Sequence, residues 1–444
     1  MNKMKNLKQI TPLLRGVGGV LITLLTLFTS EQCFSQNYAD KVYYLVDSLD
    51  LDALTEDDKK LIETSLKEYY KAKDDTSKIK ALNYICENMM HNDWSKYQFY
   101  QHEIIQKALI KNPSSSIKKS LLFSLASALN NIGYIYHIQG YIPKALEYYH
   151  KSLTIQEEIA DKSGISQSLS NIGTIYKGQG DIPKALDYNY KSLKIREEIG
   201  DKKGIAVSLN NIGIIYKGQG DVYKTLENFH KSLKIYEEIG DKSGAAISLN
   251  NIGSLYSAQG DIPKALEYYH KSLKIEEGVG NKKGIALSLN NIGGIYNKKG
   301  ELLKALECYN QSLKIREEIG NKVGIANSLI NIGALEIEQG MFASAEINLQ
   351  RSLKLAREVG SPKWISISSS HLSSLFKKQG KHQLAMQLYE LYIQMRDSIN
   401  NEATQKATAQ QEAKYAYEKQ KTIDDAEHNK QLAIEQESKA KQKV

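Results

Sequence analysis

Cysteine and proline are scarce in this chain: of 444 residues, three are cysteine and six are proline. Cys86 and Cys308 lie far apart, and Cys33 lies in the N-terminal segment, so no disulfide framework holds the protein together. The only long apolar run, from Val17 to Phe28, is also N-terminal. With 41% apolar and 25% charged residues, the composition excludes a disordered or collagen-like chain.

The first 35 residues have the order of a secretory signal peptide. Lys3, Lys5 and Lys8 precede the apolar run, and a polar stretch follows it. About 12 apolar residues span roughly 18 Å of helix, which is short for a permanent membrane anchor. We expect cleavage after Ser35 and a periplasmic or secreted protein without a transmembrane span. An uncleaved anchor and lipidation of Cys33 are the alternatives.

The net charge of +8 does not indicate a nucleic-acid-binding protein. Part of the excess lies in the N-terminal segment, and basic and acidic residues alternate over the rest. A nucleic-acid interface would gather Lys and Arg on one face with aromatic residues between them, and no such stripe is present. We therefore expect no nucleic-acid partner.

Motifs of catalysis and metal binding are missing as well. The mature sequence has no GxxxxGK[ST] loop, GxSxG elbow, HExxH or CxxC. His150, His230 and His270 recur in one column, but successive units stack about 10 Å apart, too far for shared ligation of one metal. The sequence predicts no enzyme activity, no cofactor and no metal site.

A regular internal repeat dominates the sequence. Residues 171–200 and 251–280 are nearly identical, and glycines recur every 40 residues without insertion or deletion at Gly140, Gly180, Gly220, Gly260, Gly300, Gly340 and Gly380. Of the 30 glycines, 23 fall in four such columns, so they mark fixed structural positions rather than flexible linkers.

Each 40-residue unit predicts two helices. Apolar residues over 164–179 follow a helical period, and Gly180 fits a left-handed cap before Asp181, the N-cap of the second helix. A glycine recurs inside the first helix, as at Gly133 and Gly173, although it costs about 1 kcal/mol relative to Ala. We expect the missing Cβ to let the second helix approach closely.

The unit resembles a tetratricopeptide repeat (TPR). The signature positions are occupied by Leu169, Ile172, Gly173, Tyr176, Gly180 and Ala185, and the fit covers residues 124 to about 400. The period of 40 rather than 34 is similar to the long-helix repeats of kinesin light chains and of bacterial sensor and regulatory proteins. The aromatic residue expected four positions after the alanine is replaced by Asn189 and Leu349 in two units.

This resemblance implies an all-α, right-handed superhelical solenoid with a charged C-terminal helix. We divide the chain into a signal peptide (1–35), a helical lead-in (36–74), a degenerate capping repeat with linker (75–123), seven repeats (124–400) and a tail (401–444). The tail, without Gly or Pro, is expected to be a solvated helix, a frayed segment or a coiled coil with a second chain.

In this family the first helices line a concave face, where ligands bind. Helical angles place polar columns opposite the apolar stripe, and Asn and Lys there suit an extended peptide that is acidic or ends in a carboxylate. The candidate groove residues are Asn130, Tyr134, Lys177, Asn210, Lys217, Asn250, Asn290, Asn297, Lys298 and Lys377. A neighbouring column, Asn131 to Asn331, is expected to join adjacent repeats instead.

The sequence therefore predicts an exported, non-catalytic scaffold that binds a protein or peptide. The combination of signal peptide, 40-residue repeats and charged helix also resembles the extracytoplasmic part of Bacteroidetes-type membrane regulators, such as histidine kinases and nucleotide cyclases. In those proteins a membrane span follows the charged helix. This chain ends at Val444 without one, so we expect either a separate membrane signalling partner or a truncated receptor.

Overall fold

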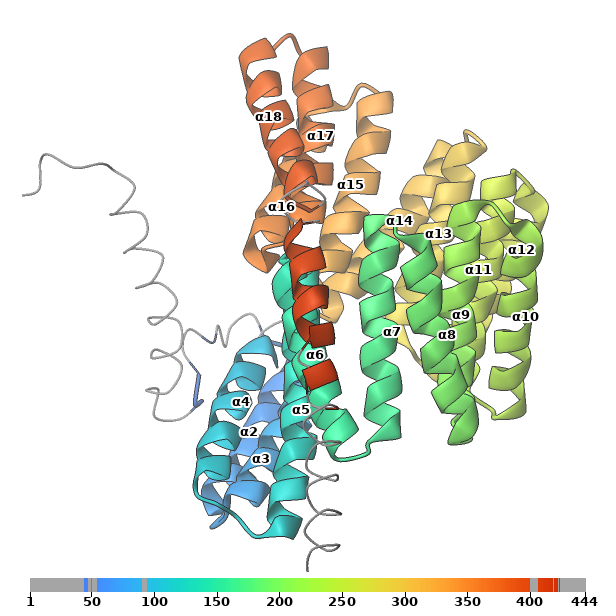
Figure 1. Ribbon diagram of the computed structural model, residues 1–444. Coiled ribbons are helices and arrows are strands. Elements are labelled where there is room, and N and C mark those ends of the chain that lie inside the picture. Colours follow the sequence, from blue (N-terminus) through green and yellow to red (C-terminus); the bar gives the residue numbers. More distant parts are fainter. Residues whose placement is uncertain are drawn as a thin grey trace, which may run out of the picture. The chain divides into compact units, whose positions relative to one another are not determined.

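The computed structural model describes residues 44–46, 49, 54–89, 94–399, 406–417, 419–421 and 423 (Figure 1). The predicted signal peptide and its cleavage site lie outside these residues. The helices are α2 (Glu56–Lys71), α3 (Asp75–Asn88), α4 (Trp94–Ile110), α5 (Ser115–Ile138), α6 (Ile142–Glu158), α7 (Lys162–Gln179), α8 (Ile182–Glu198), α9 (Lys202–Gln219), α10 (Val222–Glu238), α11 (Lys242–Gln259), α12 (Ile262–Val279), α13 (Lys282–Lys298), α14 (Leu302–Glu318), α15 (Lys322–Glu338), α16 (Phe342–Val359), α17 (Pro362–Lys378) and α18 (His382–Ile399).

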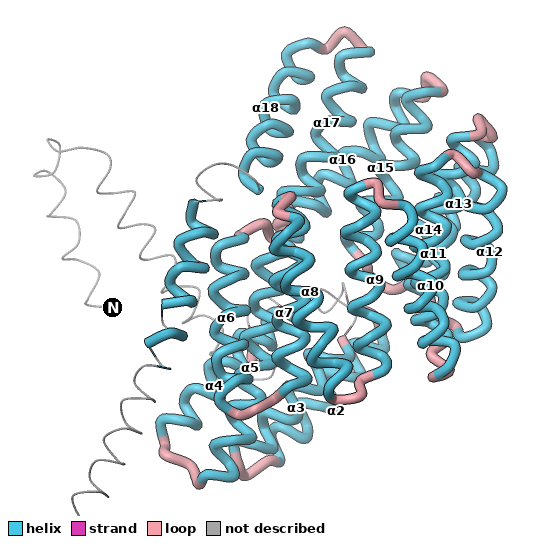
Figure 2. The backbone as a smooth tube through the Cα atoms, turned by 45° about the vertical axis from the view of Figure 1, so that its right-hand side comes forward, coloured by secondary structure: helices cyan, strands magenta, loops and turns pink. Residues whose placement is uncertain are grey.

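The helices form consecutive antiparallel pairs that stack on one another, and Figure 2 shows helices joined by short loops throughout the described part. Seven such pairs follow one another from α5–α6 to α17–α18, and the prediction of an all-α solenoid is confirmed. Helices α2 to α4 precede them, with α2 covering the helix expected around Leu61 to Tyr70.

Close packing within a pair depends on the glycine inside the first helix, as predicted. A Cβ built on Gly133 of α5 would lie 2.8 Å from the Tyr149 ring and 3.2 Å from the carbonyl oxygen of Ala145, both on α6. Since real Cβ atoms do not approach carbon this closely, only glycine allows the two helices to pack at this distance.

The helix ends follow from the residues predicted to cap them. Gly180 ends α7 in the left-handed conformation with φ of 80°, and the Asp181 side chain accepts a hydrogen bond from the Lys184 amide at the start of α8. The same Gly-Asp pair ends α9 and α11 and begins α10 and α12. The 40-residue period therefore fixes where each helix begins and ends.

A serine in six of the seven second helices bonds to the first helix of its own pair. The Ser152 hydroxyl donates a hydrogen bond of 2.7 Å to the carbonyl of Ala126, 26 residues earlier, and both are buried. The same bond recurs at Ser192, Ser232, Ser272, Ser312 and Ser352. These hydroxyls satisfy carbonyl groups inside the stack.

The C-terminal tail contains a helix over residues 406–417, continued at 419–421, which we call the tail helix. It packs against α6 and α8 of the same chain: Tyr415 joins their apolar core, and Glu412 contacts His150 and Tyr188 (Figure 1). None of the three arrangements expected for this segment included such an intramolecular contact.

No helix among the described residues has the length and apolar character needed to cross a membrane.

Candidate functional site

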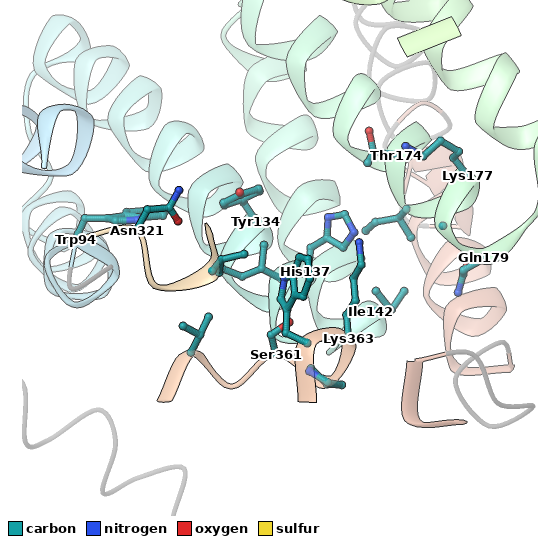
Figure 3. A pocket seen from close by; sticks show the side chains of 18 of the residues that line it. Trp94, Tyr134, His137, Ile142, Thr174, Lys177, Gln179, Asn321, Ser361 and Lys363 are labelled. Atoms are coloured by element: carbon teal, nitrogen blue, oxygen red, sulfur yellow. The ribbon is translucent and has the colours of Figure 1, made fainter. Parts of the chain in front are cut away.

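A cavity of about 810 Å³ lies on the side of the first helices. Tyr134 and His137 of α5 and Thr174 and Lys177 of α7 form one wall, and the connection from α16 to α17 forms another (Figure 3). Trp94 and Trp364, the two tryptophans of the chain, both line it. Aromatic and aliphatic walls with a few polar groups are typical of ligand-binding cavities.

The cavity is basic. Lys177, Lys283 and Lys363 line it together with His137, and no acidic side chain is among its described lining residues. Burial and the nearby charge of Lys363 lower the pKa of Lys177. Burial and Lys177 likewise lower the pKa of His137. Because the charges of Lys177 and Lys363 repel each other, an anionic group placed between these two lysines would be stabilised.

The cavity is bounded by residues from opposite ends of the repeat array. Gly140, in the turn between α5 and α6, lies against Pro362 at the start of α17, and a Cβ at Gly140 would lie 2.9 Å from the Pro362 Cγ atom. Its positive φ of 79° and this close contact both favour glycine. The contact positions Ser361, Lys363 and Trp364 opposite α5 and α7.

Two predicted groove residues, Tyr134 and Lys177, line this cavity. Lys217 and Lys298 lie on α9 and α13, the first helices of later repeats. Lys217 contacts the Ser254 hydroxyl, and Lys298 donates to the Ser257 hydroxyl at 2.9 Å. Asn297 is half-buried, and Lys377 is exposed near the end of α17. These four residues are not part of the cavity wall, and a binding role for the predicted set stays a prediction.

The predicted asparagines occupy a different position from the one expected. Asn130, Asn210 and Asn250 are each 5% exposed and lie between adjacent first helices, not on an open groove. Asn290 is half-buried, and its side-chain oxygen accepts from Asn331. Each first helix packs against the first helices of the repeats before and after it, and this packing covers the asparagine column. The helical angles of a single unit do not show these contacts.

The prediction that the next column joins adjacent repeats is confirmed. Side-chain amides of this column donate to the repeat before them, as Asn171 does to Asn130 at 3.0 Å and Asn291 to Asn250 at 3.2 Å. The other bonds of the series come from Asn131, Asn211, Asn251 and Asn331. The buried amides are thus satisfied by one another.

Trp94, Lys283, Lys363 and Trp364 also line the cavity and were not predicted from the sequence. Trp94 precedes the regular array, and Trp364 stands where the five preceding repeats have glycine, whereas Lys283 and Lys363 follow the repeat and carried no such signal. Departures from a repeated pattern were the available signal, since a position that differs between otherwise copied units is free to serve a local role.

The sequence matches the tetratricopeptide repeat family model over residues 124–198, 204–277, 284–358 and 325–398, which is more than half of the chain. The chain belongs to the tetratricopeptide repeat family. A comparison with curated protein sequences finds no significant match.

Several solved structures are similar to this chain. A Rap conjugation gene regulator of plasmid pLS20, in complex with the Phr* peptide, is 14% identical with a TM-score of 0.52, covering 77% of this chain and 95% of its own. A Rap protein complexed with competence and sporulation factor is 14% identical with a TM-score of 0.48, covering 82% and 98%. A putative kinesin light chain from Podospora anserina is 15% identical with a TM-score of 0.35, covering 44% and 96%.

Proposed function

We propose that this TPR protein is a non-catalytic scaffold that binds a peptide or protein segment bearing a carboxylate in the basic cavity. The observation that carries the proposal is the set of three lysines and two tryptophans on the walls, where the described lining residues include no acidic side chain. The pLS20 regulator, which has the same fold, binds a peptide.

Charge and shape both favour such a ligand. Lys177 and Lys363 come from opposite walls, so a carboxylate between them would contact both sides of the closure. Trp94 and Trp364 offer flat apolar surfaces for neighbouring side chains of the ligand. A terminal carboxylate and an acidic side chain present the same group to the lysines, and the experiment separates them.

Tryptophan fluorescence provides a direct test because both tryptophans of the chain line the cavity. The full-length chain is titrated with three short peptides of one sequence: an acidic peptide with a free C-terminus, its C-terminally amidated form, and a form with the acidic side chains replaced by amides. We expect a saturable change with the first peptide that weakens as salt concentration rises. Weaker binding of the amidated peptide would show that the terminal carboxylate is bound, and weaker binding of the side-chain amide form would show that an acidic side chain is bound.

Variants then locate the site. Lys177→Ala combined with Lys363→Ala should weaken binding about tenfold or more, since each lost ionic hydrogen bond contributes roughly 1.5–3 kcal/mol. Lys194→Ala, which removes one exposed lysine on α8 outside the cavity, should bind as the parent does. Equal binding by the double variant would show that the cavity is not the peptide site.

We also propose that the protein is exported to the periplasm or secreted, and that it acts beside or as part of a membrane signalling protein. The Lys3 to Phe28 pattern supports export. N-terminal sequencing of the protein recovered from its native cell tests this, with Gln36 expected as the first residue. Recovery of an intact N-terminus from the cytosol would contradict export.

A further inference from the structure

The tail helix is held at one defined place on the solenoid. Glu412 lies at its centre: His150 Nε2 is 3.0 Å from one carboxylate oxygen, and the Tyr188 hydroxyl donates to the other at 3.1 Å. Gln179 donates to the Thr408 hydroxyl at 3.2 Å. We call the solenoid side of this contact the first docking site, formed by His150, Glu157, Tyr176, Gln179 and Tyr188.

Two further contacts complete this arrangement. The Tyr415 ring stacks on the His150 ring with centroids 4.0 Å apart, and Lys419 pairs with Glu157 at 2.6 Å. Together the helix presents Thr408, Glu412, Tyr415 and Lys419 at spacings of four, three and four, which places them on one face. The tail helix therefore binds through a defined four-residue pattern.

All five side chains of the first docking site recur 80 residues later. The equivalents are His230, Glu237, Tyr256, Gln259 and Tyr268, on α10, α11 and α12. We call this set the second docking site. Because the repeat has no insertions, each side chain occupies the same position on its helix as in the first site.

The geometry of the second site is also preserved. The Tyr256 and Tyr268 rings stack 5.5 Å apart at 16°, compared with 5.6 Å and 9° for Tyr176 and Tyr188. Lys264 lies 4.9 Å from the centre of the Tyr256 ring, and Lys184 lies 4.8 Å from that of Tyr176. The tyrosine pair therefore adopts this arrangement without a docked helix.

The two sites differ in what covers them. His150 and Tyr176 are each 2% exposed beneath the tail helix, whereas His230 is exposed and Tyr256 half-buried. Gln259 and Glu237 are exposed as well. The second site thus presents to solvent the groups that contact the tail helix at the first.

Other repeats do not keep the set. The His, Tyr and Tyr positions of the first docking site become Tyr190, Tyr216 and Asn228 after 40 residues, His270, Tyr296 and Cys308 after 120, and Asn310, Glu336 and Asn348 after 160. Among the described repeats, the complete set is present at the first and second docking sites alone.

We propose that the second docking site binds an α-helix of another protein that carries the tail pattern: a carboxylate, a tyrosine three residues later and a lysine four residues after that. The occupant comes from a different protein because the chain's own tail already covers the first site, where its attachment keeps it at a high effective concentration. This surface is formed by α10, α11 and α12, and none of its five residues lines the proposed peptide cavity.

The test uses the tail sequence itself as the probe. A fluorescein-labelled peptide of residues 404–423 is added to the full-length chain, and fluorescence anisotropy is recorded. We expect saturable binding that weakens about tenfold or more in the double variant His230→Ala, Tyr268→Phe. The peptide with Glu412→Gln should show a similar loss.

His270→Ala is the matched control, because it removes a histidine of the same column in a repeat that lacks the second tyrosine. It should bind the peptide as the parent chain does. Circular dichroism confirms that all variants keep their helix content. Absence of saturable binding, unchanged binding by the double variant, or an equal loss in His270→Ala would each overturn the proposal.

Discussion

The imidazole ring of His150 stacks on the phenol ring of Tyr415, with centroids 4.0 Å apart and planes inclined by 19°. One residue lies on α6 and the other in the tail helix, so the contact fixes the C-terminal segment to an early repeat. Burial opposes ionisation of the adjacent Glu412, but the hydrogen bonds with His150 and Tyr188 outweigh it and hold the pKa of this carboxyl below its usual value. The tail is therefore docked through an ionised side chain.

Glu412→Gln should release the tail helix. A neutral amide loses the charge-assisted bonds to His150 and Tyr188, and we expect the docking equilibrium to shift about tenfold or more. Hydrogen exchange of backbone amides over residues 406–421 measures this shift. Gln410→Ala, on an exposed position of the same helix, serves as the control; unchanged protection in Glu412→Gln would contradict the docking model.

Glu276→Gln should stabilise the protein at pH 7. Glu276 is 1% exposed, and burial raises its pKa. Because the pKa of this carboxyl is higher in the folded than in the unfolded chain, its contribution to stability is complete at pH values below the unfolded-chain pKa. This contribution is lost as the pH rises through the folded-state pKa. The amide avoids this loss, and Gln156 already occupies the equivalent buried position, where Ser168 donates to it.

We expect Glu276→Gln to gain about 1 kcal/mol at pH 7. The gain should shrink as the pH is lowered toward the ordinary glutamate range. Urea unfolding midpoints at pH 5 and pH 7 provide the measurement, with the exposed Glu277→Gln as control. A gain that does not depend on pH would contradict the assignment to the Glu276 carboxyl.

Two alanine substitutions in neighbouring helices should have opposite effects. A Cβ at Gly253 of α11 would lie 2.9 Å from the Tyr269 ring and 3.3 Å from the Ala265 carbonyl oxygen. Gly253→Ala should therefore destabilise the protein by about 1–3 kcal/mol. At Gly278 of α12 the Cβ would enter open space, so Gly278→Ala should stabilise by about 1 kcal/mol. Thermal unfolding of both variants measures the difference, and equal shifts would contradict the close-packing explanation.

Asn250→Ala should lower stability without affecting peptide binding. The Asn250 amide donates to the Ser288 hydroxyl at 3.0 Å and its oxygen accepts from Asn291, so the change leaves buried groups unpaired at a cost of about 1–3 kcal/mol. Asn297→Ala, at a half-buried position, should change stability by less than about 0.5 kcal/mol. Denaturant midpoints and the fluorescence titration separate the two effects; a loss of binding in Asn250→Ala at unchanged stability would restore the groove assignment.

The features that the sequence predicted are local to one repeat or to two neighbours. The Gly180 and Asp181 caps, the close approach at Gly133 and the joining role of the Asn131 column each depend on contacts that recur every 40 residues. The burial of Asn130 was missed because a helical wheel of one unit omits the neighbouring first helices.

The cavity and the tail contact depend on longer distances. Whether Pro362 contacts Gly140 is determined by the small rotations between successive helix pairs, added over all the intervening pairs. The sequence of one repeat does not predict this total rotation. Docking of Glu412 on His150 likewise joins a polar tail to one repeat among several similar ones. Both contacts required the three-dimensional arrangement of the whole array.

The contact between Gly140 and Pro362 gives the number of repeats a functional meaning. The serine bonds within pairs and the asparagine bonds between pairs are alike from one unit to the next, so removing one whole unit, such as residues 201–240, would let the remaining helices join again. The shortened array would stack well but would no longer align Pro362 with Gly140. Array length in this protein therefore sets the gap between two walls of the proposed peptide cavity, and we expect gain or loss of a single unit to change which peptide fits there while leaving the fold intact.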